Sequence, residues 1–488
     1  MSICSSTRST FFRSLCALNK VNKNARTIFQ AVGGNLPKSK LKYFMMTPVS
    51  IHNSSYYVRC LDISPRILTL AKAGKIEASH TPQFKDFDGH ENNFALDYLV
   101  SQKQYKSLLC PPGLDWYPTW NNSETQALKS SDWYLHCKPI VQQFLEASLS
   151  SSHKSLSHPE YIDMIQTLVD EVQKLSKDEI MKILYHMSFF SLTASVKEPT
   201  YFSLWKALDN EICARYSGWE NPFWFGIDYL MFRLKLNRLT SFHWTFINRL
   251  FRHCDKLTKE QFVWLMFCLN LVRRIPPNFS IYDLEHKLLS FASNMTAEEI
   301  SIVAMGFFKT QTRIRDLHLY KTLVNNVIQH ASTLHSVGVS AFAKFVRHSS
   351  SHANVESTLR FQEAFFPQID RLTLTAGTHI ILSGTLNQIP FRDGIAKVMD
   401  RVEKEIENVR LKELERVALT GTMFNMGSNS FYEKLVQELR LSGRKEELHQ
   451  YGRSLPALLY YLTIKEIFPQ DLIGKVLSKE FIVQYYGK

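Results

Sequence analysis

A unit of 37 to 41 residues recurs along this chain from about residue 175 to the C-terminus. Most units carry apolar residues five, eight, nine and twelve positions after their first residue. After Leu257 these are Phe262, Leu265, Met266 and Leu269. The unit that begins at Leu372 fits less well, with Gly377 and Gly384 at two of these offsets. The offsets lie on one side of a helix, because residues three and four apart share a face. A period of this length indicates a solenoid of helical hairpins, whose units cover their apolar faces by stacking on their neighbours.

The unit starts recur in register along the chain. They fall at Leu175, Leu257, Met295, Leu334, Leu372 and Val409, with an irregular unit at 219–256 and a final one at 448–488. Three first helices are predicted to begin with capping boxes, at Ser176 with Glu179, Thr258 with Gln261, and Thr296 with Glu299. Prolines after the first helices predict the hairpin turns, because proline cannot continue a helix interior. We therefore expect an all-α helical-hairpin repeat solenoid behind an irregular N-terminal region.

The first 61 residues contain nine basic residues and no acidic one, with many Ser, Thr and Asn. Such an N-terminus is typical of an organellar transit peptide, and the alternative is a disordered basic tail. We expect residues 1–45 to be a mitochondrial transit peptide or disordered, 46–157 to be an irregular N-terminal region, and 158–488 to be the helical repeat array. The expected compartment is the mitochondrial matrix.

The leader accounts for most of the positive charge. The whole chain has a net charge of +13, from 58 Lys and Arg against 45 Asp and Glu. Without residues 1–61 there are 49 against 45, a net charge of +4. A nucleic-acid ligand therefore has to be argued from the local distribution of charge.

The eight cysteines form no CxxC pair, which excludes a zinc ribbon or a disulfide framework. No run of 18 apolar residues occurs, so no membrane span is expected. Enzyme motifs are missing as well: the sequence has no GxxxxGK phosphate-binding loop, no HRD, no DFG and no GxSxG. We expect no enzyme activity, no catalytic residue, no metal and no cofactor.

Basic residues cluster in the middle of the array and keep register with the repeat. Arg273, Arg274, Lys309, Arg313 and Arg347 lie 13 to 18 residues after their unit starts, near the end of the first helix or in the hairpin turn. Stacked units would align them along one edge. The predicted RNA-binding residues are Arg233, Lys235, Arg238, Arg249, Arg252, Arg273, Arg274, Lys309, Arg313, Arg315, Lys344, Arg347 and Arg392.

A stripe of Arg and Lys suits the phosphates of single-stranded RNA, because binding releases condensed counterions and helical repeats can read splayed bases. Two other interpretations stay open. Cations near helix C-termini also stabilise the helix, by about 0.3–1 kcal/mol each through its dipole. The array could also be a scaffold that binds matrix proteins without contacting RNA.

Particular stretches of the repeats resemble the FAST-kinase-domain family of mitochondrial RNA-binding proteins. These stretches are Leu-Thr-Lys-Glu-Gln-Phe at 257–262, Met-Thr-Ala-Glu-Glu-Ile at 295–300, and Leu-Pro-Ala-Leu-Leu-Tyr-Tyr-Leu at 455–462. The resemblance covers about residues 160–488. It implies binding to mitochondrial transcripts and a part in their processing, stability or translation, often near RNA granules and with other RNA-processing proteins.

The resemblance carries no site residue and no kinase activity to this chain. Family members continue into a second conserved segment and a C-terminal RAP domain with a nuclease-like fold, whereas this sequence stops at Lys488. The RAP domain is absent from this sequence, and a short isoform, an incomplete gene model and a true loss all stay open as explanations. Any catalytic role belonging to that domain is therefore not carried over.

Overall fold

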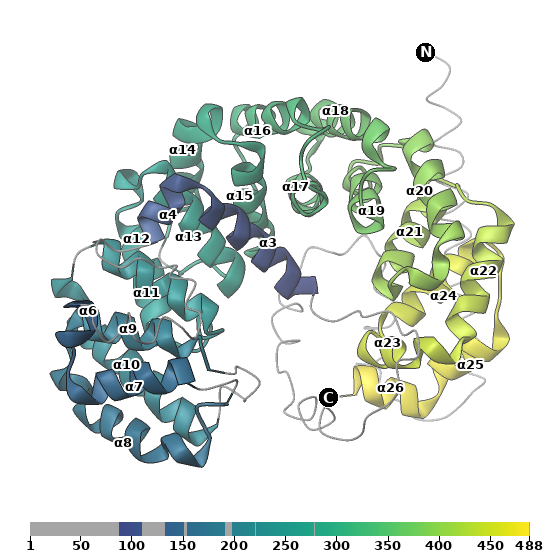
Figure 1. Cartoon of the computed structure of the whole chain (residues 1–488). Helices are drawn as coiled ribbons and strands as arrows, with labels where there is room; N and C mark the ends of the chain where they lie inside the picture. Colours follow the sequence, from purple (N-terminus) through teal and green to yellow (C-terminus); the bar gives the residue numbers. More distant parts are fainter. Residues whose placement is uncertain are drawn as a thin grey trace. The chain divides into compact units, whose positions relative to one another are not determined.

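The computed structural model describes residues 87–109, 132–150, 154–190, 198–219, 221–277 and 279–487. All of them belong to one compact unit, Ala78–Lys488. The predicted transit peptide at 1–45 lies outside the described residues. Within the described residues, every regular element is a helix (Figure 1), so the predicted all-α fold is confirmed.

The helices alternate as the repeat predicts, with a first and a second helix in each unit. The first helices are α7 (Pro139–Ser150), α9 (Lys177–Met187), α11 (Asn221–Arg233), α13 (Lys259–Val272), α15 (Ala297–Lys309), α17 (Ser336–His348), α19 (Leu374–Ser383), α21 (Leu411–Met423) and α24 (Ser454–Ile464). The second helices are α8 (Ile162–Glu171), α10 (Pro199–Arg215), α12 (Ser241–Arg252), α14 (Ile281–Phe291), α16 (Leu317–Gln329), α18 (Val355–Phe365), α20 (Arg392–Lys404), α22 (Asn429–Arg440) and α25 (Gln470–Leu477). The remaining α-helices are α3 (Phe87–Ser101), α4 (Lys103–Leu109), α6 (Asp132–Leu135), α23 (Lys445–Gln450) and α26 (Lys479–Tyr486).

The three predicted capping boxes are confirmed at the starts of α9, α13 and α15. At α15, the Glu299 backbone N–H donates to Thr296 Oγ1 at 3.2 Å, and the Thr296 N–H donates to the Glu299 carboxylate at 2.9 Å. Each box supplies partners for backbone N–H groups that the helix itself leaves unpaired. Helix starts are thus set locally by the sequence, which keeps the units in register.

Consecutive first helices pack side by side, and Figure 1 shows α13, α15, α17 and α19 as neighbours. Close approach depends on small residues: a Cβ added to Gly306 in α15 would lie 2.6 Å from the carbonyl oxygen of Met266 in α13. Every residue of α13 from Phe262 to Leu271 is buried, because other helices surround it. Two clusters of buried apolar residues make up the core, and they adjoin at α19, where Ile380 belongs to one and Ile381 to the other.

The region expected to be irregular, 46–157, contains helices in its described part. Figure 1 shows α3 running across α13 and α15, and α4 packs against α11 and α13. The phenol of Tyr105 in α4 is fully buried and donates to the Glu299 carboxylate at 2.7 Å. A segment far from the repeats in sequence therefore covers part of the face that the first helices form.

Candidate nucleic-acid interface

Six of the nine first helices end in a common backbone conformation. Among the described residues, the non-glycine residues with positive φ are Lys235, Arg273, Gln311, Gln388, Asn425 and Glu466, and each follows a first helix by one to five residues. Helices α9 and α17 end instead in residues with negative φ. A left-handed residue there lets the chain hydrogen-bond back onto the helix end. Thr312 N–H donates to the Phe307 carbonyl at 2.9 Å, for example. At these six helix ends, backbone N–H groups of the turn thus satisfy some of the last carbonyls.

The turns that follow lie next to one another. We call them the turn edge, made of the described residues of 234–240, 273–280, 310–316, 349–354, 384–391 and 424–428. Contacts run from turn to turn, or from a turn to the neighbouring helix end. They are Arg238 Nε to Leu271 O (2.8 Å), Arg315 Nη1 to Tyr282 Oη (2.6 Å), Ile314 N to Ser349 Oγ (3.4 Å), Asn387 Nδ2 to Ser351 O (3.0 Å) and Arg392 Nη1 to Met426 Sδ (3.5 Å). The alignment of hairpin turns expected from the repeat register is present in the fold.

Eight of the predicted RNA-binding residues lie on or beside this edge. Seven are exposed and Arg273 is half-buried; the seven are Arg233, Lys235, Arg238, Arg274, Arg313, Arg315 and Arg392. Aromatic rings hold two of them, since the Arg274 guanidinium lies 4.0 Å from the Trp244 ring centroid and that of Arg315 5.2 Å from the Tyr282 ring. A ring orients a guanidinium without neutralising its charge. These cations can therefore still attract an anion.

Arg249 and Arg252 lie elsewhere, at the C-terminal end of the second helix α12. The Arg249 guanidinium stacks 3.6 Å from the Trp224 ring centroid. Both arginines line an open hollow with Tyr216, Thr245, Asn248 and His253. The turn edge follows first helices, so these two residues do not belong to it.

Lys309 and Lys344 lie beneath α3, where both approach Glu91. Lys344 forms an ion pair with this carboxylate, and Lys309 Nζ lies 3.8 Å from it. Only 14% and 11% of the two lysine side chains are exposed. In this arrangement neither ammonium group is available to a ligand.

Arg347 is half-buried near the end of α17, among other cations and buried imidazoles. Burial lowers the pKa of His379 well below its usual range, and the positive charges of Arg416, Lys344 and Arg347 lower it further. The pKa of His348 is also lowered, mainly by burial and with contributions from Arg313 and Arg347. Positive potential thus extends from the turn edge onto the adjoining first helices.

A second group of cations, which the sequence analysis did not single out, lies where one unit is linked to the next. We call this the linker edge, made of residues 172–176, 253–258, 292–296, 330–335, 366–373 and 405–410. The donors are basic residues in, or just after, the second helix of the unit that follows each linker. The acceptors are backbone carbonyls of that linker. The pairs are Arg215 with Leu175 (2.8 Å), Lys287 with Asp255 (2.8 Å), Arg371 with Ala331 (2.8 Å), Arg401 with Ile369 (2.8 Å) and Arg444 with Ile406 (2.8 Å). The only sequence signal is a basic residue 32 to 40 positions after its acceptor.

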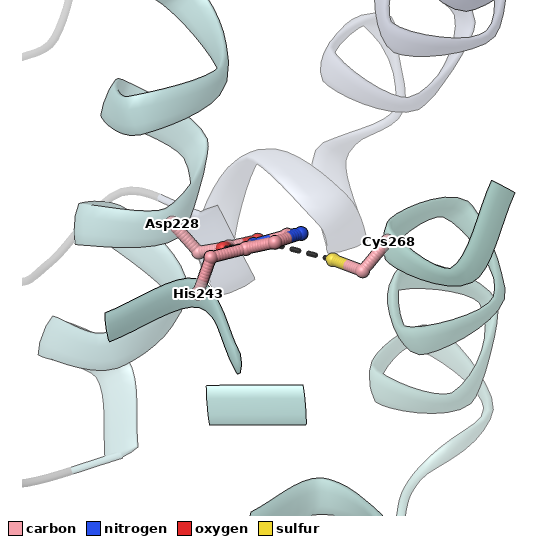
Figure 2. A group of neighbouring side chains, drawn as sticks. All are labelled: Asp228, His243 and Cys268. Atoms are coloured by element: carbon pink, nitrogen blue, oxygen red, sulfur yellow. Dashed lines mark hydrogen bonds and ion pairs between the residues drawn. The ribbon is translucent and has the colours of Figure 1, made fainter. Parts of the chain in front are cut away.

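A buried polar cluster joins α11, α12 and α13 (Figure 2). Asp228, His243 and Cys268 offer ligand atoms within 4.8 Å of one another, and all three are buried. Asp228 already accepts hydrogen bonds at both carboxylate oxygens. The bonds come from His243 Nδ1, from Trp264 Nε1 at 2.9 Å and from Cys268 Sγ at 3.1 Å.

An Asp, His and Cys set is one that zinc accepts, but a structural zinc site takes four ligands and a thiolate sulfur. Burial raises the pKa of Cys268 well above its usual range, and the Asp228 charge raises it further. The thiol therefore keeps its proton and donates to Asp228. The geometry fits a buried polar hub centred on Asp228 better than a metal site, although the buried His243 Nε2 has no hydrogen-bond partner among the described residues. No sequence pattern pointed to this hub.

Among the described residues, no helix combines the length and apolar character needed to cross a membrane. No protein-family model matches the chain. Curated proteins do match, all named "FAST kinase domain-containing protein 5, mitochondrial". The mouse protein is 22% identical over 337 residues, covering 67% of this chain and 42% of its own length. The crab-eating macaque protein is 22% identical over 391 residues, covering 75% and 49%.

The human protein is 24% identical over 236 residues, which cover 47% of this chain and 30% of the human protein. The matches thus span less than half the length of each of these relatives. They agree with the family suggested by the repeat motifs at 257–262, 295–300 and 455–462. By sequence comparison, the chain is similar to mitochondrial proteins of the FAST-kinase-domain family.

Proposed function

We propose that this protein binds single-stranded RNA in the mitochondrial matrix and acts in the processing, stability or translation of organellar transcripts. In this proposal the turn edge follows the RNA backbone, and the protein works by binding and not by catalysis. The names of the matching proteins, which include the word mitochondrial, support the mitochondrial compartment. The RNA ligand is supported by the family resemblance and by the charge of the turn edge.

The observation that carries the proposal is the recurrence of exposed cations on adjacent turns. Lys235, Arg274 and Arg313 lie in three successive turns of the array and are exposed. A polyanion that follows the turns would meet a cation at each unit and release a counterion at each phosphate contact. The ring of Trp244 beside Arg274 adds a surface on which an unpaired base could stack.

The direct test changes Lys235, Arg274 and Arg313 together to Glu. Binding of a fluorescent single-stranded RNA oligonucleotide to the full chain is measured by anisotropy over a series of salt concentrations. We expect at least a ~10-fold loss of affinity, because each reversed charge replaces an attraction by a repulsion of similar size.

The matched control changes three exposed lysines away from the turn edge to Glu: Lys445, Lys475 and Lys479. Both variants alter the net charge by the same amount, so a loss caused only by overall charge would appear in both. Equal affinities for the two triple variants would reject the turn edge as the RNA-binding surface.

A protein-binding scaffold is the second candidate, and exposed apolar side chains near the C-terminal end of the array favour it. Phe468 is 55% exposed, Val483 60% and Leu477 43%. Large apolar side chains in water mark a protein contact when they gather on one surface. If the turn-edge variant binds RNA normally while Phe468→Ser and Val483→Ser abolish copurification of a specific protein, this alternative is favoured.

A further inference from the structure

Helix α3 makes polar and aromatic contacts to three successive first helices. The Asn270 side chain in α13 donates to Asn92 Oδ1 at 2.7 Å, and the Tyr98 hydroxyl lies 2.8 Å from Thr296 Oγ1 at the start of α15. The Phe94 ring stacks on His335, the N-cap of α17, with centroids 4.1 Å apart. These partners are far away in sequence, so α3 folds back over the array as a cover.

At the centre of this contact, one carboxylate lies between two lysine ammonium groups. The Glu91 carboxylate is 6% exposed and faces the ammonium groups of Lys309 and Lys344. Two cations around one carboxylate leave a net charge of +1 at a buried site. A buried ion pair adds little net stability, because desolvation offsets much of the attraction. Another anion that reached the lysines could therefore replace Glu91 at modest cost, whereas leaving them unpaired would cost several kcal/mol.

The chemistry that α3 presents to this face resembles that of a nucleotide. Glu91 and Phe94 are three residues apart and so share one side of α3. Glu91 offers an anion to two lysines, and Phe94 offers a flat ring to the His335 imidazole. A phosphate and an unpaired base of single-stranded RNA offer the same two groups, and bases commonly stack on aromatic or imidazole rings.

We infer that the face of α13, α15 and α17 beneath α3 is a second RNA-binding surface, and that α3 occupies it in this state as an intramolecular substitute for RNA. The inference rests on the proposed RNA-binding function and extends it from the turn edge onto the first helices. When RNA displaces α3, Lys309 and Lys344 take a phosphate in place of the Glu91 carboxylate.

Helix α3 is packed unevenly on the array. Leu96 and Leu99 of α3 are buried, as are Tyr105 and Leu109 of α4, and the Tyr105 hydroxyl donates to Glu299. Beneath α3, by contrast, a pocket remains between Phe94 and Tyr98 on one side and Met305 and Gly338 on the other. The α4 contacts can therefore anchor the segment while α3 leaves its face.

The experiment locks α3 in place. Asn92 and Asn270, whose side chains touch, are both changed to Cys in the full chain and bridged as a disulfide, with diamide as the oxidant that takes up the two thiol protons and two electrons. We expect the bridged protein to bind a fluorescent single-stranded RNA oligonucleotide at least ~5-fold more weakly than the same protein before bridging. The bridge prevents α3 from leaving the face that would bind the RNA. The control is Asn92→Cys alone, treated identically, which should keep its affinity.

A second variant works in the opposite direction and needs no crosslink. Glu91→Gln removes the competing carboxylate, so we expect RNA affinity to rise ~3- to 10-fold as the uncovered state becomes more populated. Adding Lys309→Gln and Lys344→Gln should cancel the gain. Thermal unfolding of each variant confirms that the array remains folded.

Unchanged affinity in both the bridged protein and Glu91→Gln would overturn the inference. The turn-edge variant, in which Lys235, Arg274 and Arg313 are changed to Glu, separates this result from the proposed function. If that variant still lost RNA affinity, RNA binding at the turn edge would stand. If the turn-edge variant also bound normally, the proposed function itself would fail.

Discussion

The two edges of the repeat array carry the same kinds of basic residue with different roles. On the linker edge, Arg401 and Arg444 donate to backbone carbonyls of the linker at the start of their own unit. On the turn edge, Arg274 and Arg313 are exposed. The difference follows from how the helix ends are completed. Most first helices close onto themselves through left-handed residues such as Gln311, with one side-chain donor, Arg238, at the end of α13. The linkers leave carbonyls that need donors from elsewhere.

The comparison teaches that a basic residue near a helix end indicates a ligand only after the local carbonyls are accounted for. A cation that completes the backbone of its own fold is not available to RNA. Substitutions on the linker edge should therefore affect stability, and those on the turn edge should affect binding.

The largest effect is expected at Arg444, whose side chain is 5% exposed. It donates to Glu438 at 2.5 Å and to Glu447 at 2.8 Å, and to the carbonyls of Ile406 and Glu407. Arg444→Ala would leave two buried carboxylates without their cation and should lower the free energy of unfolding by about 3–5 kcal/mol. Denaturant titration measures this.

The control for that experiment is Arg440→Ala. Arg440 pairs with Asp471, but both side chains are about half exposed, and exposed ion pairs contribute little. If the two substitutions had equal effects, the distinction between clamping and exposed arginines would be wrong.

A smaller decrease in the free energy of unfolding is expected for Arg401→Leu. One Nη of Arg401 donates to Ile369 O at 2.8 Å and to Leu372 O at 2.6 Å. Without it, two linker carbonyls lose their partner, which should cost about 1–3 kcal/mol of stability. RNA affinity of the folded protein should not change, and reduced affinity at full folding would contradict the division between edges.

Gln311→Gly tests the closure of the turn edge. Gln311 has a φ of 58°, a conformation that costs an L-residue about 1 kcal/mol or more and that glycine adopts freely. We expect the substitution to raise the free energy of unfolding by about 0.5 kcal/mol, after the greater freedom of glycine in the unfolded chain is subtracted. Gln437→Gly, inside α22, should instead lower it by about 1 kcal/mol.

The smallest effect on stability belongs to the turn-edge cations. Changing Lys235, Arg274 and Arg313 to Gln should alter the free energy of unfolding by less than about 1 kcal/mol, because all three are exposed. The slope of the logarithm of the RNA association constant against the logarithm of salt concentration should become shallower by about 2. Each of the three lost phosphate contacts accounts for roughly 0.7 of this change. A large loss of stability with an unchanged salt slope would mean that the turn-edge cations support the fold, as the linker-edge cations do, and do not bind RNA.

Much of the fold could be predicted because it is encoded locally. The capping pairs Ser176 with Glu179 and Thr296 with Glu299 are three residues apart, and the apolar offsets lie within one helix. Such patterns are visible without knowledge of distant contacts. The alignment of the turns follows from repetition alone, which is why Arg274, Arg313 and Arg315 were found on one edge.

The features that escaped prediction depend on long-range contacts. Glu91 meets Lys344 across 253 residues of sequence, so no pattern could show that two of the predicted RNA-binding lysines are covered. Cys268 and Asp228 are 40 residues apart and belong to different helices. The linker clamps could not be distinguished from solvated cations, since both appear in sequence as a basic residue near a helix end.

The clamps of the linker edge all run in one direction along the chain. Arg371, Arg401 and Arg444 each hold backbone of the linker at the start of their own unit. Each hairpin thus fastens the linker that joins it to the hairpin before it, and loss of one unit leaves the carbonyls of that linker bare. Under tension applied to its ends, such an array would yield hairpin by hairpin, with the loss of each clamp weakening the next unit toward the N-terminus.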